Sequence, residues 1–197
     1  HLNHPNFKWA LTAEDIAEVV EEQFFEVYNG HKQVFVNGDE HRAGNEKLWD
    51  IANTLRLSKL HGQPLFGVGT DDAHNYHGEE QSPGRGWVMV RSEKLEAGAL
   101  VNAMKKGDFY ASSGVTLEDV SFKDNTLHLK IKGEPGVTYS TRINGTLKDY
   151  DATTTEAIMP KGDPHPVRKN YSADVGKVLA TIEGTDASYK LKIGRAS

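Results

Sequence analysis

The stretch from Pro64 to His74 reads PLFGVGTDDAH, and it sets the pattern by which the rest of the chain is interpreted. Its first six residues form a short apolar run, which is typical of a strand buried on both faces of a parallel sheet. A polar run from Thr70 to His74 follows at once. Because ligands and catalytic groups gather at the carboxyl ends of such strands, the stretch predicts a parallel sheet with a site at its edge.

The chain on either side of this stretch alternates in the same way up to about residue 112. Apolar runs predict strands, and amphipathic runs predict helices, the first of them capped by Thr12. The expected strands cover residues 24–28, 64–69, 87–90 and 109–111, and the expected helices cover residues 12–23, 45–60 and 93–106. Helices that alternate with continuous apolar strands indicate an α/β fold.

From about residue 113 the pattern changes to strict alternation of apolar and polar residues. The alternating segments are 115–122, 126–132, 138–143, 175–183 and 187–193. Such segments indicate antiparallel strands with one solvated face, so we expect a small, all-β, sandwich-like domain. The segment 160–170, with two prolines beside His165, is expected to be irregular. The predicted domains are therefore residues 1–113 and 114–197.

The composition of the 197 residues excludes several classes of function. The formal net charge of -5 argues against a general basic field for nucleic acid. No apolar run approaches the ~20 residues that cross a bilayer. The absence of cysteine rules out disulfides, thiolate metal sites and a cysteine nucleophile. Any metal must therefore be held by His, Asp, Glu or water. The lack of cysteine does not determine the cellular compartment of the protein.

Two short motifs carry the chemistry at the predicted sheet edge. Asp72 and His74 are two residues apart at the end of a strand, so their side chains can point the same way and meet one cation. His4 follows another expected strand, and Pro5 fixes the backbone beside it. On the residues alone, two interpretations remain open: a metal site, or a loop in which Asp72 caps a turn and His74 lies on the surface.

Five motifs, which occur in order along the chain, favour the metal-site interpretation. They are Asn3-His4-Pro5-Asn6-Phe7, Phe25-Glu26-Val27-Tyr28-Asn29-Gly30, Leu48-Trp49-Asp50, Gly69-Thr70-Asp71-Asp72-Ala73-His74-Asn75 and Gly107-Asp108-Phe109-Tyr110-Ala111-Ser112-Ser113-Gly114. Together they resemble the C-terminal portion of polymerase-and-histidinol-phosphatase (PHP) domain metallohydrolases, in particular the carbaryl-hydrolase-like branch. The resemblance implies part of a distorted α/β barrel with zinc, manganese or iron at its rim. It also implies that His4, Asp72 and His74 are metal ligands.

The activity that this resemblance implies is metal-dependent hydrolysis of phosphoesters or related esters. Asp72 and His74 would hold the cluster that activates water. Arg85 is a candidate to bind an anionic small-molecule substrate, although it could equally be a solvated loop arginine. Glu26 and Asn29 either form hydrogen bonds at the rim or orient ligands. His31, His41 and His77 could also face the rim.

The family's earlier ligands, which include a His-x-His, have no counterpart in this chain. We therefore expect a lost N-terminal segment or a partner chain to complete the barrel, and little or no hydrolase activity from these 197 residues alone. The resemblance favours a periplasmic or secreted protein. The alternative function is a non-catalytic binding module, in which the barrel is degenerate and the β-rich domain binds a carbohydrate or a protein partner.

Overall fold

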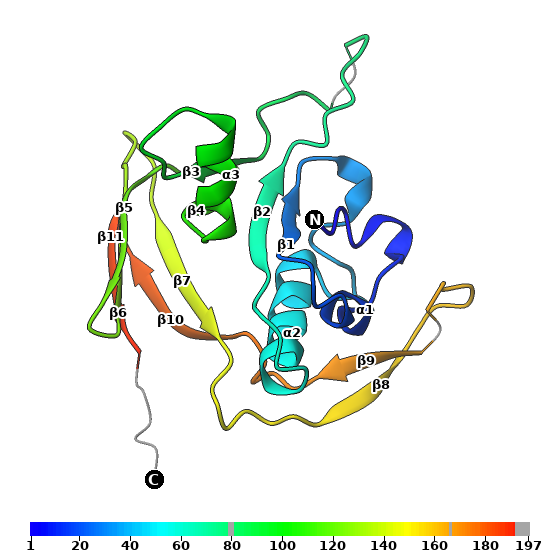
Figure 1. Cartoon of the computed structure of the whole chain (residues 1–197). Helices are drawn as coiled ribbons and strands as arrows, with labels where there is room; N and C mark the ends of the chain where they lie inside the picture. The colour runs from blue at the N-terminus through cyan, green and yellow to red at the C-terminus, as the bar shows by residue number, and fades with distance from the viewer. Residues whose placement is uncertain (79–80, 166, 192–197) are drawn as a thin grey trace. The chain divides into compact units, whose positions relative to one another are not determined.

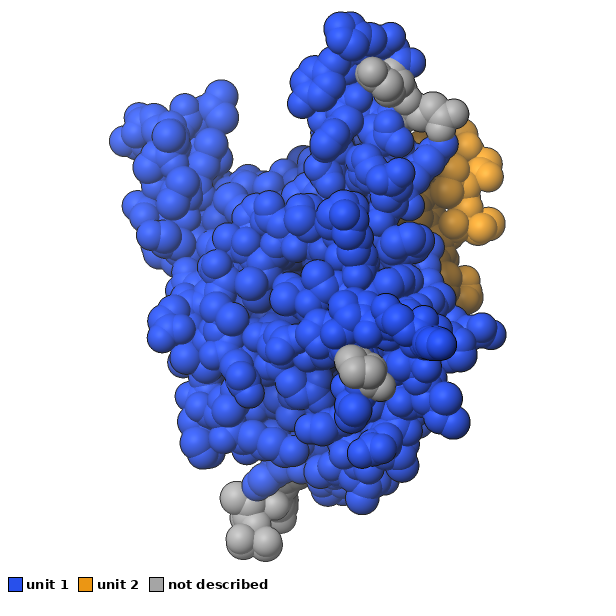
Figure 2. All heavy atoms as spheres, turned by 90° about the vertical axis from the view of Figure 1, so that its right-hand side faces the viewer, with its two compact units in different colours: residues 1–114, 147–175 blue, residues 115–146, 176–197 orange. Residues whose placement is uncertain are grey.

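The chain forms several small sheets and a few helices that fall into two compact units (Figure 1). The structure is a computed structural model that describes residues 1–78, 81–165 and 167–191. The first unit contains residues 1–114 and 147–175, and the second contains residues 115–146 and continues from residue 176 (Figure 2). The chain leaves the first unit close to the predicted boundary, but it returns to that unit for residues 147–175.

Two parallel strands form the centre of the first unit. β1 (Phe24–Asn29) pairs with β2 (Phe66–Thr70), and the register places Asn29 opposite Thr70. Leu2 extends this sheet by one bridge beside Phe25. Because the two strands run in parallel, their carboxyl ends lie side by side, and the segments after residues 29 and 70 leave the sheet at the same edge.

Two helices cover this pair of strands and complete the core. The helices are α1 (Ala13–Glu18) and α2 (Asn45–Ser58). The buried apolar side chains that pack together are Ala13, Ile16, Ala17, Phe25, Leu48, Ile51, Ala52, Leu55, Leu65 and Val175. Eight of these ten come from α1, α2 and β1, and Leu65 directly precedes β2, so the core packs the helices against the sheet.

The ends of α1 have identifiable causes. Thr12 caps the helix as predicted, since its hydroxyl accepts from the Asp15 amide while the Asp15 carboxylate accepts from the Thr12 amide. The predicted extension to residue 23 is wrong. The helix ends at Glu18, and the fully buried side chain of Arg56 donates to the carbonyls of Val19, Val20 and Glu22, which holds the following segment in a non-helical path.

Further elements of the first unit lie beyond β2. β3 (Trp87–Val90) pairs antiparallel with β4 (Phe109–Ser112), and α3 (Ala97–Lys105) connects them. β8 (Thr154–Ile158) and β9 (Val167–Tyr171) form an antiparallel pair. The second pair corrects the expectation of an irregular segment at 160–170, because residues 167–171 are a strand. Two short 3-10 helices, Phe7–Trp9 and Lys32–Val34, lie in the loops.

The second unit consists of two small antiparallel sheets. One contains β5 (Leu117–Lys123), β6 (Thr126–Ile131) and β11 (Asp186–Lys190), with β6 in the centre. The other contains β7 (Ser140–Gly145) and β10 (Lys177–Glu183). All five strands fall within or close to the alternating segments of the sequence, so the pattern located them correctly.

The predicted fold class, a partial PHP-type α/β barrel followed by a sandwich-like domain, is wrong. Strands make up 32% of the residues and helices 19%. In the described part, β1 and β2 are the only two strands that pair in parallel, and one parallel bridge at Leu2 lies beside them. None of the described sheets closes into a barrel, and the largest has three strands. The physical reason is that a short apolar run specifies burial but not the direction of the neighbouring strand: β3 and β4 pair with each other instead of extending β2. No described helix is long and apolar enough to cross a bilayer.

Candidate functional site

Asp72 and His74 come together directly after β2. Oδ1 of Asp72 lies 3.2 Å from Nε2 of His74, and both side chains are partly exposed. The sequence predicts that these side chains point the same way, and they do, but not because the backbone is extended. Asp72 has a φ of 47°, in the left-handed region that Asp tolerates better than most residues. The turn at Asp72 is what brings its carboxylate back towards the imidazole.

The neighbouring Asp71 forms hydrogen bonds with the backbone of a different segment. Oδ1 of Asp71 accepts the backbone N–H groups of Arg85 at 2.6 Å and Gly86 at 2.9 Å. These hydrogen bonds hold the segment around residue 85 against the end of β2 and lower the pKa of the Asp71 carboxyl. Asp71 therefore links the end of β2 to the segment at residues 85 and 86, and Asp72 faces the histidine.

Asn29, at the end of β1, bridges two carboxylates. Its Nδ2 donates to Oε2 of Glu26 at 2.9 Å and to Oδ2 of Asp72 at 3.1 Å, and its Oδ1 accepts from the His31 amide at 2.7 Å. Asn29 and Glu26 are both only 3% exposed. Glu26 also accepts from Oγ1 of Thr70 at 2.5 Å. The parallel register of β1 and β2 creates this arrangement, because it places residues 29 and 70 opposite each other.

The pKa of the Asp72 carboxyl lies below its ordinary value. Burial raises this pKa, but the hydrogen bonds from Asn29 and His74 and the nearby His31 lower it by more. Asp72 is therefore an anion at neutral pH. A permanently ionised carboxylate beside an imidazole is a donor set for a divalent cation of the zinc or manganese type.

His31 lies next to this pair, with its ring centroid 5.1 Å from that of His74. Its Nδ1 accepts a hydrogen bond from the Gln33 amide at 3.2 Å, which caps the 3-10 helix Lys32–Val34. In the neutral ring, a nitrogen that accepts leaves the proton on the other nitrogen. Nε2 of His31 is therefore a hydrogen-bond donor, and His31 suits contact with an anion better than ligation of a metal.

Arg85 also belongs to this edge of the sheet. A Cβ placed on Gly30 would lie 2.8 Å from Cβ of Arg85 and 2.9 Å from the Asp71 carbonyl oxygen. The stem of Arg85 thus packs against the residue that follows Asn29. Its Nη1 is buried, and no described residue accepts a hydrogen bond from it. A buried guanidinium N–H without an acceptor costs free energy, which a bound anion would recover.

His4 reaches the site through its backbone. Its amide donates to Oε2 of Glu26, and its ring packs edge-on against Phe7 with the centroids 5.4 Å apart. Among the described residues, no three His, Asp or Glu side chains form a group that could hold a metal ion. Asp72 and His74 are thus a pair, and the ligand role of His4 stays a prediction. His41 lies elsewhere, with its Nε2 3.1 Å from Oε1 of Glu40.

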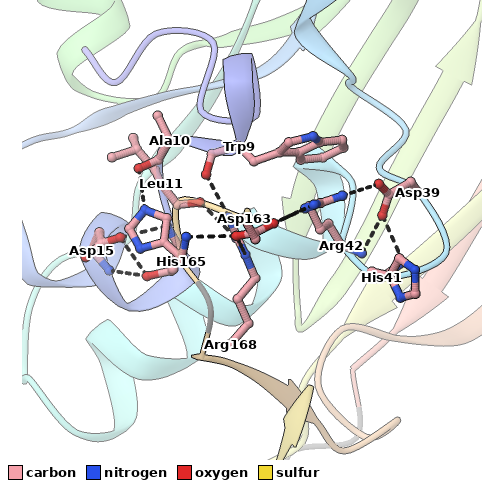
Figure 3. A network of polar contacts seen from close by, with 11 residues as sticks. Trp9, Ala10, Leu11, Asp15, Asp39, His41, Arg42, Asp163, His165 and Arg168 are labelled. Atoms are coloured by element: carbon pink, nitrogen blue, oxygen red, sulfur yellow. Dashed lines mark hydrogen bonds and ion pairs between the residues drawn. The ribbon is translucent and has the colours of Figure 1, made fainter. Parts of the chain in front are cut away.

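A second polar cluster, which the sequence did not reveal, lies in the same unit. Figure 3 shows the carboxylate of Asp163 at its centre, with Arg42 and Arg168 on either side. Arg42 also pairs with Asp39 and stacks over the ring of Trp9, 4.5 Å from its centroid. The residues come from segments more than a hundred positions apart, so no local motif could have identified them.

This cluster borders a cavity of about 290 Å³. Leu48 and Ile51 of α2 contribute to its apolar lining, and Glu14, Arg42 and Lys169 are among its charged residues. The charged groups are largely matched within the protein: Arg42 bonds Asp39 and Asp163, and Lys169 lies 3.8 Å from Glu14. The cavity can therefore accept a small polar molecule without a large net charge.

The chain matches no protein-family model, no curated protein and no solved structure. The arrangement of its own residues is accordingly the basis for any statement about function.

Proposed function

We propose that this chain supplies a carboxylate–histidine pair, Asp72 and His74, to a metal-dependent centre that hydrolyses phosphoesters or related esters. The observation that carries the proposal is the 3.2 Å separation of Asp72 Oδ1 and His74 Nε2. Two ligands of one cation with bonds of ~2.0–2.2 Å lie about 2.8–3.6 Å apart at octahedral or tetrahedral angles. The pair therefore fits two neighbouring positions around a zinc, manganese or iron ion.

A divalent cation bound here would supply Lewis acidity toward a phosphoryl or carbonyl oxygen. Asp72 suits the role of ligand because its lowered pKa keeps it ionised, so a cation does not compete with a proton at neutral pH. His74 would bind through its neutral form. No third ligand comes from the described residues, so the other positions fall to water, to the substrate or to another chain.

The surrounding donors favour an anionic substrate. Nη1 of Arg85 is buried without an acceptor among the described residues, and His31 offers an N–H from Nε2. A phosphate or carboxylate oxygen placed between such donors forms charge-assisted hydrogen bonds. In this proposal Arg85 binds and orients the substrate, and Asp72 and His74 bind the ion.

Titration with Mn²⁺ or Zn²⁺, followed by calorimetry, tests the metal site. We expect the wild-type chain to bind one ion weakly, and Asp72→Asn and His74→Ala each to weaken binding at least ~10-fold, or about 1.4 kcal/mol. His61→Ala is the matched control, because His61 is exposed and lies outside the site. Binding that is equal in all four proteins, or absent from the wild type, would contradict the proposal.

Titration with inorganic phosphate at saturating metal tests the role of Arg85. We expect Arg85→Ala to weaken phosphate binding while it leaves the affinity for the ion unchanged, because in this proposal Arg85 contacts the anion and not the ion. Equal phosphate affinity in Arg85→Ala and the wild type would contradict this role.

A second candidate function is binding of a small polar molecule without catalysis. The cavity of about 290 Å³ beside Arg42 favours it, since sites of this size, with an apolar lining and a few fixed polar groups, are common ligand sites. The two candidates are distinguished by the titration above, because only the first requires that Asp72 and His74 bind an ion.

A further inference from the structure

Glu26 is a buried carboxylate that the proposed chemistry does not use. It is 3% exposed, yet it meets three donors from three separate segments. They are the amide of His4, Nδ2 of Asn29 and Oγ1 of Thr70. A buried charge is tolerated only when hydrogen bonds compensate it. Three donors do so here, and in return the carboxylate fixes the positions of all three.

Asn29 passes this constraint on to Asp72. An amide nitrogen has two hydrogens, and in Asn29 one is directed to Oε2 of Glu26 and the other to Oδ2 of Asp72. Its oxygen accepts from the His31 amide. Both amide hydrogens of Asn29 are therefore in use, and the amide cannot rotate without breaking its three contacts.

The two oxygens of Asp72 consequently have different environments. Oδ2 is occupied by Asn29 at 3.1 Å, and Oδ1 faces His74 at 3.2 Å. We propose that Glu26 and Asn29 are positioning residues that hold Asp72 so that only Oδ1 is presented beside His74. This inference rests on the proposed function, which assigns the ion to the same pair, and it adds that Asp72 binds through one oxygen.

The backbone conformations of Asp72 and His4 explain why hydrogen bonds are needed at these two positions. Asp72 and His4 both have a positive φ, 47° and 28°, in a region that is unfavourable for non-glycine residues. Each is tied to Glu26, His4 directly and Asp72 through Asn29. The buried carboxylate of Glu26 thus stabilises the backbone at both His4 and Asp72, the two positions beside the site where φ is positive.

Two variants and two measurements test the inference. Asn29→Ala removes the bridge, and Glu26→Gln keeps the shape and one acceptor oxygen of Glu26. The first measurement is Mn²⁺ affinity by calorimetry. The second, made without metal, is the nuclear Overhauser effect between the ring protons of His31 and His74, whose centroids are 5.1 Å apart. Glu93→Gln, at an exposed position, is the control.

We expect Asn29→Ala to weaken Mn²⁺ binding ~10–100-fold, as loss of a ligand's supporting partner does, and to abolish the ring-to-ring effect while the circular dichroism spectrum is retained. Glu26→Gln should give a smaller loss, and Glu93→Gln none. Retention of both the affinity and the ring-to-ring effect in Asn29→Ala would overturn the inference. If the wild type binds no Mn²⁺, the proposed function fails, and the metal-free measurement alone decides whether Asn29 holds His31 and His74 side by side.

Discussion

Arg42 and Asp163 are 121 positions apart in the chain, yet Nε and Nη2 of Arg42 lie 2.7 and 2.5 Å from Oδ2 of Asp163. The side chain of Asp163 is 0% exposed and that of Arg42 is 9% exposed. This buried pair ties the segment 147–175 to the loop before α2. It explains why that segment belongs to the first unit although the sequence places it among the alternating strands of the second.

The first prediction concerns this pair. Asp163→Asn keeps the shape of the side chain but leaves Arg42 and Arg168 as buried cations without their shared anion. We expect the free energy of unfolding of the first unit to fall by about 3 kcal/mol, as for other broken buried pairs. Urea unfolding measures it, with Asp149→Asn at an exposed position as the control. A loss of the same size in the control would show that the pair is not responsible.

The second prediction concerns pH. Burial raises the pKa of the Asp163 carboxyl, but the hydrogen bonds from Arg42 and from the His165 amide lower it to below its ordinary value. A group with a depressed folded-state pKa stabilises above its unfolded pKa of ~3.9, and this stability is lost as the pH falls through the folded pKa. The difference in unfolding free energy between wild type and Asp163→Asn should therefore be constant from pH 5 to 7 and shrink below about pH 4. A difference that grows on acidification would contradict this assignment.

The third prediction concerns Arg56, which is 0% exposed and donates to four carbonyl oxygens. Arg56→Ala should lower the free energy of unfolding by roughly 3–5 kcal/mol, because it removes a fully buried side chain together with its hydrogen bonds to the connection between α1 and β1. Arg56→Lys should recover only part of the loss, since one ammonium cannot reproduce the fork of the guanidinium. Denaturant melts of both variants, beside the exposed control Lys148→Ala, give the comparison. A lysine variant as stable as the wild type would show that charge alone is sufficient.

The fourth prediction uses two glycines. A Cβ at Gly30 would lie 2.8 Å from Cβ of Arg85 and 2.9 Å from the Asp71 carbonyl oxygen, so Gly30→Ala must displace the segment that carries Arg85. A Cβ at Gly98, inside α3, meets nothing within 4 Å. We expect Gly30→Ala to destabilise by about 1–3 kcal/mol and to weaken binding of inorganic phosphate, and Gly98→Ala to stabilise by up to about 1 kcal/mol. Thermal melts measure the stability changes, and a phosphate titration measures the change in binding. Unchanged phosphate binding in Gly30→Ala would show that Arg85 does not contribute to the anion site.

Elements whose signals are local could be predicted well. The pattern located α2 and β3 almost to the residue, and Thr12 caps α1 as expected, because periodicity and capping depend on neighbours within a few positions. The spacing of Asp72 and His74 likewise predicted a pair at the end of a buried strand. In each case the interacting groups lie within one turn or one strand.

Elements that depend on distant contacts could not be predicted. α1 ends at Glu18, and the segment after it is held by Arg56, which lies 37 positions after Val19 and donates to its carbonyl. β9 was expected to be an irregular segment, since nothing near residues 167–171 shows its partner β8 or its contacts with the N-terminal residues. The sheet was expected to be parallel throughout, since an apolar run specifies burial and not strand direction.

The sequence by itself determined which segments are apolar, where most helices and strands lie, and that a carboxylate and an imidazole follow β2. The tertiary structure decided which aspartate does what: Asp71 holds the backbone at residues 85 and 86, and Asp72 faces His74. It also decided that Glu26 and Asn29 connect β1 to that pair. Two adjacent aspartates are equivalent in a sequence, and only the three-dimensional positions of their hydrogen-bond donors distinguish them.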